Sequence, residues 1–303
     1  MVTVQQVERF LAVVAHGTFT AAAEQTNVTQ PALSRSVREL ERTIGAPLLE
    51  RCPRGVGLTP VGRAILPAAR ALLAEAHRVR DIGRRAAGLQ TGELHVASVQ
   101  SLTLGALLQV VHRWQEKYPL ISLRLSEFTH RARLEEAVRD GFADVAVAPR
   151  PDAWAGPVHD LGVEEFVLVL PTGSPVPAGR LPVRSLAGRR WVHYEQENGL
   201  SDVVDQVCAA AGFVPEVAVR TLQTSAAPRL AAAGLGPALV PANVLSPTDA
   251  VAVAFPEPAV RRPIAAFTRH APDPVAGAFI AMLAEHVALL PAHLRPPEHQ
   301  IRA

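Results

Sequence analysis

Apolar residues recur every three or four positions through the first part of the chain, which is the spacing of helices with one buried face. This pattern predicts three helices, at residues 4–15, 19–25 and 29–44. The apolar stripe of the third consists of Leu33, Val37, Leu40 and Ile44. Thr29 is a suitable N-cap for this helix, and Pro31 falls in its first turn, where a missing N–H costs no hydrogen bond. We therefore expect the third helix to pack one face on a core and leave the other free.

The free face of the third helix is polar and basic. It carries Pro31, Ser34, Arg35, Arg38 and Arg42. The second helix follows the N-cap candidate Thr18, and a short turn at 26–28 separates it from the third. Two helices joined by a tight turn are typical of the helix-turn-helix fold, whose second helix enters the major groove of DNA. An ordinary solvated helix face would carry similar charges, so the charges alone do not decide between these interpretations.

A short segment after the third helix predicts a β-hairpin. Residues 48–58 contain two apolar stretches on either side of a loop rich in proline and glycine, as in the wing of a winged helix-turn-helix. Arg51 and Arg54 lie in this segment and are candidate contacts for DNA phosphates or the minor groove. Residues 1–58 are thus expected to form an all-α winged helix-turn-helix domain.

Residues 59–90 show one continuous helical pattern, opened by Thr59 as N-cap and Pro60 in the first turn. At 1.5 Å per residue this helix would be roughly 40 Å long, well beyond the average for globular proteins. Its narrow apolar stripe favours pairing with a second helix. We predict a linker and dimerisation helix, and packing on its own domain is the alternative.

From residue 91 onward, short apolar segments alternate with helical ones, which is typical of an α/β fold with a parallel sheet. Strands are predicted at 94–98, 121–128, 143–148, 166–170, 191–194, 217–219, 238–241 and 264–267, and helices from about 101 to 118 and at 131–140, 202–211, 226–233 and 275–290. The buried face of the first of these helices is expected to consist of Leu104, Leu107, Leu108, Val111 and either Trp114 or Gln115. The strand at 264–267 is expected to return the chain to the first half. We therefore predict two lobes, lobe I at about 91–161 and 267–303 and lobe II at about 162–266.

Composition narrows the class of protein. Of 303 residues, 49% are apolar and 19% charged, as in a globular protein. No segment approaches the ~18 apolar residues of a membrane span, and the N-terminus lacks the features of a signal peptide, so we expect a cytoplasmic protein with no membrane partner. Cys52 and Cys208 are too far apart in sequence to suggest a disulfide framework or a zinc site.

The net charge of +2 conceals an uneven distribution. Residues 1–90 hold 12 arginines and 7 acidic residues, whereas residues 91–303 hold 18 basic and 21 acidic ones. A basic N-terminal part suits a polyanionic partner. The charge distribution therefore agrees with DNA binding by the first domain, although it is weak support by itself.

The first 62 residues resemble the DNA-binding domain of LysR-type transcriptional regulators. The matching stretches are Gly17-Thr18-Phe19-Thr20-Ala21-Ala22-Ala23-Glu24, Val28-Thr29-Gln30-Pro31-Ala32-Leu33-Ser34-Arg35, Leu40-Glu41 and Gly45-Ala46-Pro47-Leu48-Leu49-Glu50-Arg51. The resemblance implies a homodimer or homotetramer that binds double-stranded promoter DNA. It places Gln30, Pro31 and Ser34 nearest the base edges, and Thr18, Thr20, Arg35 and Arg38 on phosphates. Thr26 departs from the family pattern, which usually has leucine there, and we expect a small local loss of packing.

The same resemblance implies that the C-terminal part is a two-lobed domain like that of periplasmic binding proteins, and the run Ala231-Ala232-Ala233-Gly234-Leu235-Gly236 supports it. In such folds a ligand binds between the lobes, at the carboxyl ends of strands, where helix N-termini favour anions. The candidate effector-binding residues are Ser98, Ser101, Phe128, Ala148, Tyr194, Asn198, Thr224 and Ser225. We expect a small-molecule effector, with an organic anion as the family-level guess, whose binding alters how the protein holds or bends its promoter. Arg150 could pair with a carboxylate or remain solvated.

A non-catalytic binding protein or an enzyme on the same α/β fold is the alternative function. The sequence contains no Gly-x-Ser-x-Gly, phosphate-loop or Gly-x-Gly-x-x-Gly motif, so we predict neither catalysis nor a cofactor. His193, beside Tyr194 and Glu195, is the one suggestive cluster of chemistry, and we interpret it as structural. A transport binding protein would need export and would not carry residues 1–58.

Overall fold

The structure is a computed structural model that describes residues 1–303 apart from 27, 53–54, 87–91, 250 and 295–303. The chain forms two compact units. The N-terminal unit comprises Met1–Gly92 with Arg139–Phe142, and the C-terminal unit comprises Glu93–Val138 with Ala143–Ala303. Within the described part, every helix is too short or too polar to cross a membrane.

Three helices form the N-terminal unit's head: α1 (Val4–His16), α2 (Phe19–Gln25) and α3 (Gln30–Ile44). The Thr18 hydroxyl caps α2 by accepting a 3.2 Å hydrogen bond from the amide of Ala21, as predicted. Thr29 occupies the N-cap position of α3, as predicted, but the capping bond expected from its side chain is not formed. The first turn of α3 therefore keeps amide groups available for an external acceptor.

The predicted stripe of α3 faces the core of the head. Leu33, Val37 and Leu40 are each at most 1% exposed. They pack against apolar residues of α1 and α2 in two adjoining clusters. Ser36, a polar residue that the sequence pattern did not assign to the core, is also buried, at 5% exposure. The buried face is thus wider than the predicted stripe.

The wing forms as predicted, from the antiparallel strands β1 (Leu49–Cys52) and β2 (Gly55–Leu58). The carboxylate of Glu41 on α3 accepts hydrogen bonds from the amides of Leu48 and Leu49, at 2.8 and 3.2 Å, where the hairpin begins. At its other end, the amide of Val56 donates a 2.8 Å bond to the carbonyl of Gly17. These bonds fix the wing relative to the helix-turn-helix.

The long helix α4 (Pro60–Ala86) has 27 residues and begins where the sequence predicted. The Thr59 hydroxyl accepts a 3.0 Å hydrogen bond from the amide of Gly62. Ile65 and Ala69 pack into the core of the head, so the predicted boundary at 58–59 divides a shared core. Further along, Leu72 is 42% exposed and Val79 70% exposed. This second part leaves apolar side chains uncovered in the single chain.

One mixed sheet runs through the C-terminal unit, in the order β10-β6-β13-β5-β3-β4, and β11 also pairs with β6. Its strands are β3 (Gly92–Val99), β4 (Ile121–Phe128), β5 (Val145–Pro149), β6 (Val158–Leu170), β10 (Ala238–Pro241), β11 (Ala252–Ala254) and β13 (Arg261–Phe267). β5 is wholly buried and central, as predicted. It is parallel to β3 on one side and antiparallel to β13 on the other, so the prediction of a parallel strand holds for one edge.

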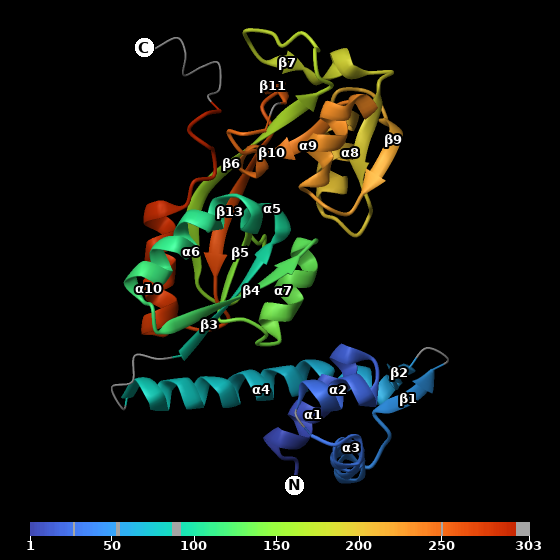
Figure 1. Cartoon of the computed structure of the whole chain (residues 1–303), viewed down its shortest axis with the longest axis vertical. Helices are drawn as coiled ribbons and strands as arrows, with labels where there is room; N and C mark the ends of the chain where they lie inside the picture. The colour runs from blue at the N-terminus through green and yellow to red at the C-terminus, as the bar shows by residue number, and fades with distance from the viewer. Residues whose placement is uncertain (27, 53–54, 87–91, 250, 295–303) are drawn as a thin grey trace. The chain divides into compact units, whose positions relative to one another are not determined.

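Lobe I packs helices on this sheet: α5 (Gln100–Leu104), α6 (Ala106–Lys117), α7 (Arg131–Arg139) and α10 (Pro274–His286) (Figure 1). The first two were predicted as one helix. It breaks at Gly105, where a Cβ atom would overlap the carbonyl oxygen of Asn243. The buried face of α6 carries Leu107 and Trp114, whereas Leu104 and Leu108 are 37% and 62% exposed, contrary to our expectation.

Lobe II has its own core, which contains Phe166, Trp191 and Leu239. Its further elements are β7 (Leu181–Pro182), β8 (Arg190–Tyr194), β9 (Glu216–Thr221), β12 (Pro256–Glu257), α8 (Leu200–Ala210), α9 (Ala226–Leu230), a π-turn η2 (Ala231–Leu235) and the 3-10 turns η1 (Val183–Leu186) and η3 (Ala242–Val244). Gly236 has a φ of 128° and lies against the carbonyl of Arg190, where no side chain fits. This explains the glycine at the end of the Ala231–Gly236 run.

Two antiparallel strands, β6 and β13, cross from one lobe to the other (Figure 1). Leu161 and Ile264 pack in the core of lobe I, whereas Phe166 packs in that of lobe II. Between them, Glu164 is fully buried and pairs with Arg262, at 2.6 Å from carboxylate oxygen to guanidinium nitrogen. The predicted lobe boundaries fall within or beside these strands, which belong to both lobes.

Candidate DNA-binding face and effector cavity

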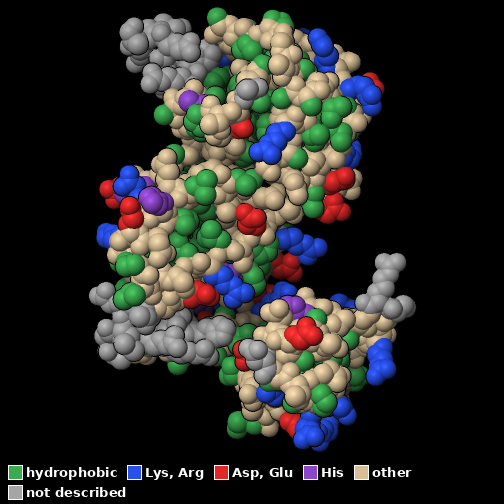
Figure 2. All heavy atoms as spheres, in the orientation of Figure 1, with side chains coloured by type: hydrophobic (Ala, Val, Ile, Leu, Met, Phe, Trp, Pro, Cys, Tyr) green, Lys and Arg blue, Asp and Glu red, His purple; other side chains and the backbone are tan. Residues whose placement is uncertain are grey.

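The outer face of α3 is basic and solvent-accessible. Gln30, Pro31, Arg35, Arg38 and Arg42 are exposed, and Ser34 is half-buried. The guanidinium of Arg38 donates a 3.0 Å hydrogen bond to the hydroxyl of Ser34, which orients both side chains along the helix. Basic side chains gather over the end of the unit where α3 lies (Figure 2). The structure thus places the predicted contacts of this helix on one accessible face.

The remaining predicted DNA contacts lie on neighbouring elements. Thr18 and Thr20, at the start of α2, are exposed, although the Thr18 hydroxyl is already engaged as the N-cap. Arg51 is exposed on β1, and Arg54 lies outside the described residues. The exposed side chains therefore come from α2, α3 and the wing, all held by the same small core.

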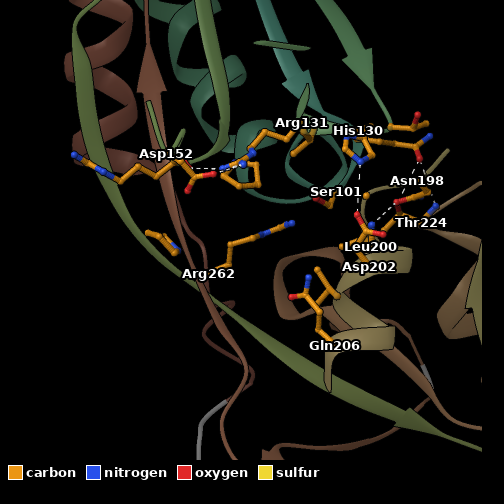
Figure 3. A pocket seen from close by; sticks show the side chains of 18 residues that line it. Ser101, His130, Arg131, Asp152, Asn198, Leu200, Asp202, Gln206, Thr224 and Arg262 are labelled. Carbon is orange, nitrogen blue, oxygen red and sulfur yellow. Dashed lines mark hydrogen bonds and ion pairs between the residues drawn. The ribbon is translucent and has the colours of Figure 1, made fainter. Parts of the chain in front are cut away.

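A cavity of about 370 Å³ opens between the lobes of the C-terminal unit (Figure 3). Three of the predicted effector residues line it, namely Ser101, Asn198 and Thr224. Five do not, namely Ser98, Phe128, Ala148, Tyr194 and Ser225. The sequence thus located the right ends of the strands but not always the right residues.

The misplacement has a simple geometric cause. The last residues of a buried strand still alternate between the faces of the sheet, and the chain turns toward the cavity one to three residues later. Ala148 is fully buried in the core, and the hydroxyl of Ser98 donates a 3.1 Å bond to the carbonyl of Val147 inside the sheet. Phe128 is half-buried and packs against the core of lobe I. The lining residues that follow these strands are Gln100, Ser101, Thr129, His130, Arg131 and Arg150.

Tyr194 and Ser225 also fail to reach the cavity. Tyr194 is fully buried in lobe II, and its hydroxyl donates a 3.2 Å hydrogen bond to the carbonyl of Leu239. Burial raises the pKa of this phenol above its ordinary value. Ser225 is the N-cap position of the short helix α9 but makes no capping bond. Neighbouring His193 is buried and bonds to Asp205 at 3.1 Å, in agreement with a structural role.

Three arginines line the cavity, and sequence reasoning had considered one of them, Arg150. Each has an acidic partner: Arg131 pairs with Asp152 at 2.6 Å, Arg150 with Asp160, and Arg262 with Glu164. The hydrogen bond and charge of Arg131 hold the pKa of the Asp152 carboxyl below its usual value. His130 lies 3.8 Å from the carboxylate of Asp202 on the facing lobe. The signal that could have located Arg131 was its place directly after strand 121–128.

Polar contacts also join the two lobes across the cavity. The amide of Gly199 donates a 2.9 Å hydrogen bond to the carbonyl of Thr129. The side-chain oxygen of Gln100 accepts bonds from the amide and the hydroxyl of Thr224, both at 3.4 Å. Asn198 lies beside Thr224 (Figure 3), and its side-chain amide donates a 2.8 Å hydrogen bond to the carbonyl of Leu222. These bonds define one side of the cavity and connect the lobes directly.

The opposite side is formed by the crossing strands, from which Arg262 extends into the cavity (Figure 3). Its guanidinium lies 5.2 Å from the centroid of the Phe166 ring. Glu164 holds it with two hydrogen bonds, at 2.6 and 2.9 Å, and in turn accepts a 2.6 Å bond from the side-chain amide of Asn243. Asn243 is the residue against which Gly105 packs. The orientation of Arg262 is therefore set by a buried network.

Comparison with known proteins agrees with both parts of the structure. The family model for bacterial regulatory helix-turn-helix proteins of the lysR family matches residues 4–63, and the model for the LysR substrate binding domain matches residues 87–288. The HTH-type transcriptional regulator IlvR of Caulobacter vibrioides is 31% identical over 247 residues, which cover 80% of this chain and 83% of that one. A probable hydrogen peroxide-inducible genes activator of Mycobacterium avium is 30% identical over 250 residues, covering 80% and 79%.

Solved structures share the fold along nearly the whole chain. A full-length OxyR variant from Pseudomonas aeruginosa has a TM-score of 0.72 at 22% identity, covering 96% of this chain and 97% of that one. CbnR, a LysR family transcriptional regulator, has a TM-score of 0.69 at 24% identity, covering 95% and 100%. With a helix-turn-helix domain and a substrate-binding domain both matched, the chain belongs to the LysR family of bacterial transcriptional regulators.

Proposed function

We propose that this LysR-family regulator holds promoter DNA with the outer face of α3, the start of α2 and the wing, and that it senses a small organic anion in the cavity between its lobes. The observation that carries the DNA part is the exposed guanidinium of Arg35. Among the described residues it has no ion pair or hydrogen bond, and it lies on a helix whose other face is fully packed. An unpaired cation on a helix that is held in place by its packed face is suited to contact a phosphate of the DNA backbone.

The cavity supports a small ligand with negative charge. Its volume of about 370 Å³ suits a small metabolite. Arg131, Arg150 and Arg262 line it together with Asp152 and Asp202, while the acidic partners of Arg150 and Arg262 lie outside the lining. Because guanidinium groups match carboxylates in a planar, two-pronged geometry, we propose Arg262 and Arg150 as the groups that an anionic effector would meet. Ser101, Asn198 and Thr224 would supply the uncharged contacts.

Ligand binding would be linked to DNA binding through closure of the lobes. Contacts such as Gln100 with Thr224 already join the lobes on one side, so a ligand that bridges both would favour one arrangement of the C-terminal units. In a dimer, that arrangement sets how two heads face two half-sites. By linkage, promoter DNA would alter the affinity for the effector by the same factor.

We propose binding without turnover. The hydroxyls in the cavity lining belong to Ser101, Thr129 and Thr224, and none hydrogen-bonds to a histidine or a carboxylate among the described residues. A hydroxyl nucleophile needs an adjacent base of this kind. The lining is therefore suited to holding a ligand rather than to attacking one.

A response to peroxide through the cysteine of the C-terminal unit, suggested by the names of some relatives, does not fit this chain. Cys208 is fully buried, and burial together with the charge of Asp205 raises the pKa of its thiol to about 12. The thiolate is the reactive form, so this sulfur would be inert at neutral pH. Cys52, the other cysteine, is exposed on the wing, in the other unit.

The test is selection of DNA fragments from the organism's own genome by the purified protein, near physiological salt. We expect a short dyad-symmetric site bound at least about 10³-fold more tightly than random sequence. Arg35→Ala should weaken that binding, whereas Arg113→Ala, which changes an exposed arginine of α6, should not. If no sequence is enriched, or if the two variants behave alike, the proposed role of α3 is wrong.

A further inference from the structure

A recess of about 290 Å³ opens between α1 and α3 in the N-terminal unit. It is lined by Arg9 of α1 and by Thr29, Pro31, Arg35, Ser36 and Glu39 of α3 and its N-cap. Arg9 was not among the predicted DNA contacts, and Ser36 was not assigned any role. The recess is therefore lined both by residues of the proposed DNA-binding face and by two residues, Arg9 and Ser36, to which no function has been assigned.

Ser36 is the least expected group in the recess. It is only 5% exposed, and its hydroxyl makes no hydrogen bond with any described residue. Its oxygen is not among the fully buried, unpaired side-chain atoms of the described residues, so the hydroxyl opens onto the recess and is free to donate there. Since Ser36 lines the recess, an acceptor bound there would satisfy it.

The charges around the recess favour an anion. Arg9 is half-buried and Arg35 exposed, and neither guanidinium has an ion pair or hydrogen bond with the described residues. Glu39, two turns along α3 from the first residues of the helix, is the acidic group of the lining. Two free guanidiniums against one carboxylate leave a net positive recess, with its acidic end away from the start of α3.

The start of α3 adds backbone donors. This 15-residue helix begins beside the recess, its N-cap Thr29 makes no capping bond, and Pro31 has no N–H to offer. The unsatisfied amides and the helix dipole favour negative charge at this position. Charge, backbone and the unpaired Ser36 hydroxyl thus converge on the same small space.

We propose that this recess binds one phosphate of the DNA backbone, with Arg9 as its charged contact from α1 and Ser36 as its buried hydrogen-bond donor. The proposal rests on the proposed function, because Arg35 and Pro31 belong both to the recess and to the DNA-facing side of α3. A phosphodiester supplies the negative charge that the two arginines lack and the acceptor oxygens that Ser36 lacks. α1 would then anchor the head on the backbone while α3 faces the bases.

The test measures affinity for a short duplex of arbitrary sequence over a range of salt concentrations, using the full-length protein. The slope of log K against log salt is negative, and removing one cation from a phosphate makes it shallower by about 0.9. We expect Arg9→Gln to make the slope shallower by that amount per bound head, and Arg9→Lys to keep the slope of the wild type. Ser36→Ala removes no charge, so it should weaken binding several-fold with the slope unchanged. Arg113→Gln, in the other unit, is the matched control for removal of a surface charge.

The outcomes separate this proposal from the function on which it rests. If the slope for Arg9→Gln equals that for Arg113→Gln while Arg35→Gln gives a shallower slope, α3 binds DNA but the recess does not hold a phosphate. If Ser36→Ala binds like the wild type, the hydroxyl is no donor and the proposed site is overturned. If the wild type shows no salt-dependent binding, the proposed function itself fails. Thermal unfolding of each variant, followed by circular dichroism, shows that the fold is retained.

Discussion

The two proposed binding sites differ in how the chain assembles them. The DNA-facing groups come from residues 18–51, and most lie along the single helix α3. The cavity is lined by residues from Val99 to Pro263, which lie on both lobes and on a crossing strand. A site on one helix keeps its geometry wherever the helix packs, whereas the cavity exists only when distant segments are correctly placed.

The charges of the two sites also differ. On α3 the guanidinium of Arg35 is unpaired among the described residues, whereas each cavity arginine already has an acidic partner, as Arg262 has Glu164. Unpaired surface cations attract DNA of any base sequence, and this attraction depends strongly on the salt concentration. An arginine that is already paired with a carboxylate attracts an anion less strongly, so the ligand must also match the N–H groups that the pair leaves unused. The head is thus built for electrostatic attraction and the cavity for selection.

The largest effect should follow from breaking the buried pair behind the cavity. Glu164→Ala would leave Arg262 and Asn243 without their buried partner, which typically costs about 3–5 kcal/mol of unfolding free energy. Urea unfolding followed by tryptophan fluorescence measures it, because all three tryptophans, Trp114, Trp154 and Trp191, lie in the C-terminal unit.

Two controls turn this into a comparison of the units. Glu127→Ala removes an exposed carboxylate of β4 and should change stability by less than about 0.5 kcal/mol. Arg35→Ala, on the exposed face of α3, should be as mild while weakening DNA binding. A loss below about 1 kcal/mol for Glu164→Ala would mean that the paired charges do not maintain the cavity.

A smaller effect should distinguish the apolar surfaces of the two units. Leu72 on α4 and Leu108 on α6 are 42% and 62% exposed, and the homodimer or homotetramer that the sequence predicts would need apolar surfaces of this kind. We expect Leu72→Glu to weaken dimerisation at least about ten-fold, which corresponds to about 1.4 kcal/mol. Leu108→Glu should weaken a second contact between C-terminal units. Sedimentation measures both, with Val214→Glu, at an isolated 88% exposed position, as the control. Should all three variants associate like the wild type, neither surface is an interface.

The smallest effect concerns the thiols. A thiol reagent at neutral pH should modify Cys52 readily and Cys208 only after unfolding, because burial raises the pKa of Cys208 to about 12. The folded state keeps this proton to higher pH than the unfolded state, whose thiol titrates near about 8.5. Stability should therefore fall as pH rises from about 8.5 toward 12, and less so in Cys208→Ser. Rapid labelling of two thiols in the native protein would contradict the buried position.

Peroxide provides the functional counterpart of the thiol experiment. Operator binding by Cys208→Ser should match that of the wild type with and without peroxide, since a protonated, buried sulfur does not react. A peroxide response that disappears in this variant would show that the cavity is not the sole input to the regulator.

The sequence predicted the local structure of the head closely. The bounds expected for the helix at 29–44 differ from α3 by one residue, because periodicity, a proline in the first turn and Gly45 at the end all act within a few residues. In the C-terminal unit, the helix predicted to reach Tyr118 breaks at Gly105, since the backbone of Asn243 lies against it. That contact spans well over a hundred residues and leaves no local pattern.

The cavity shows the same limit for function. The rule that ligands bind at the carboxyl ends of strands identified Ser101, Asn198 and Thr224, and narrowly missed His130 and Arg131. It could not identify Arg262, whose side chain faces the cavity because Glu164 of a neighbouring strand holds it there. Pairing between strands β6 and β13 is a tertiary feature that no motif encodes.

The sequence alone determined the family, the helix-turn-helix, the wing, the long α4 and the two-lobed α/β architecture, because short-range periodicity, caps and an unbroken motif specify them. The tertiary structure decided which strand ends open into the cavity, how its arginines are paired and oriented, and that Arg9 and Ser36 share a recess with α3. The physical reason is range: hydrogen bonds within a helix or turn join residues a few positions apart, whereas a binding site depends on packing between segments that only the folded chain brings together.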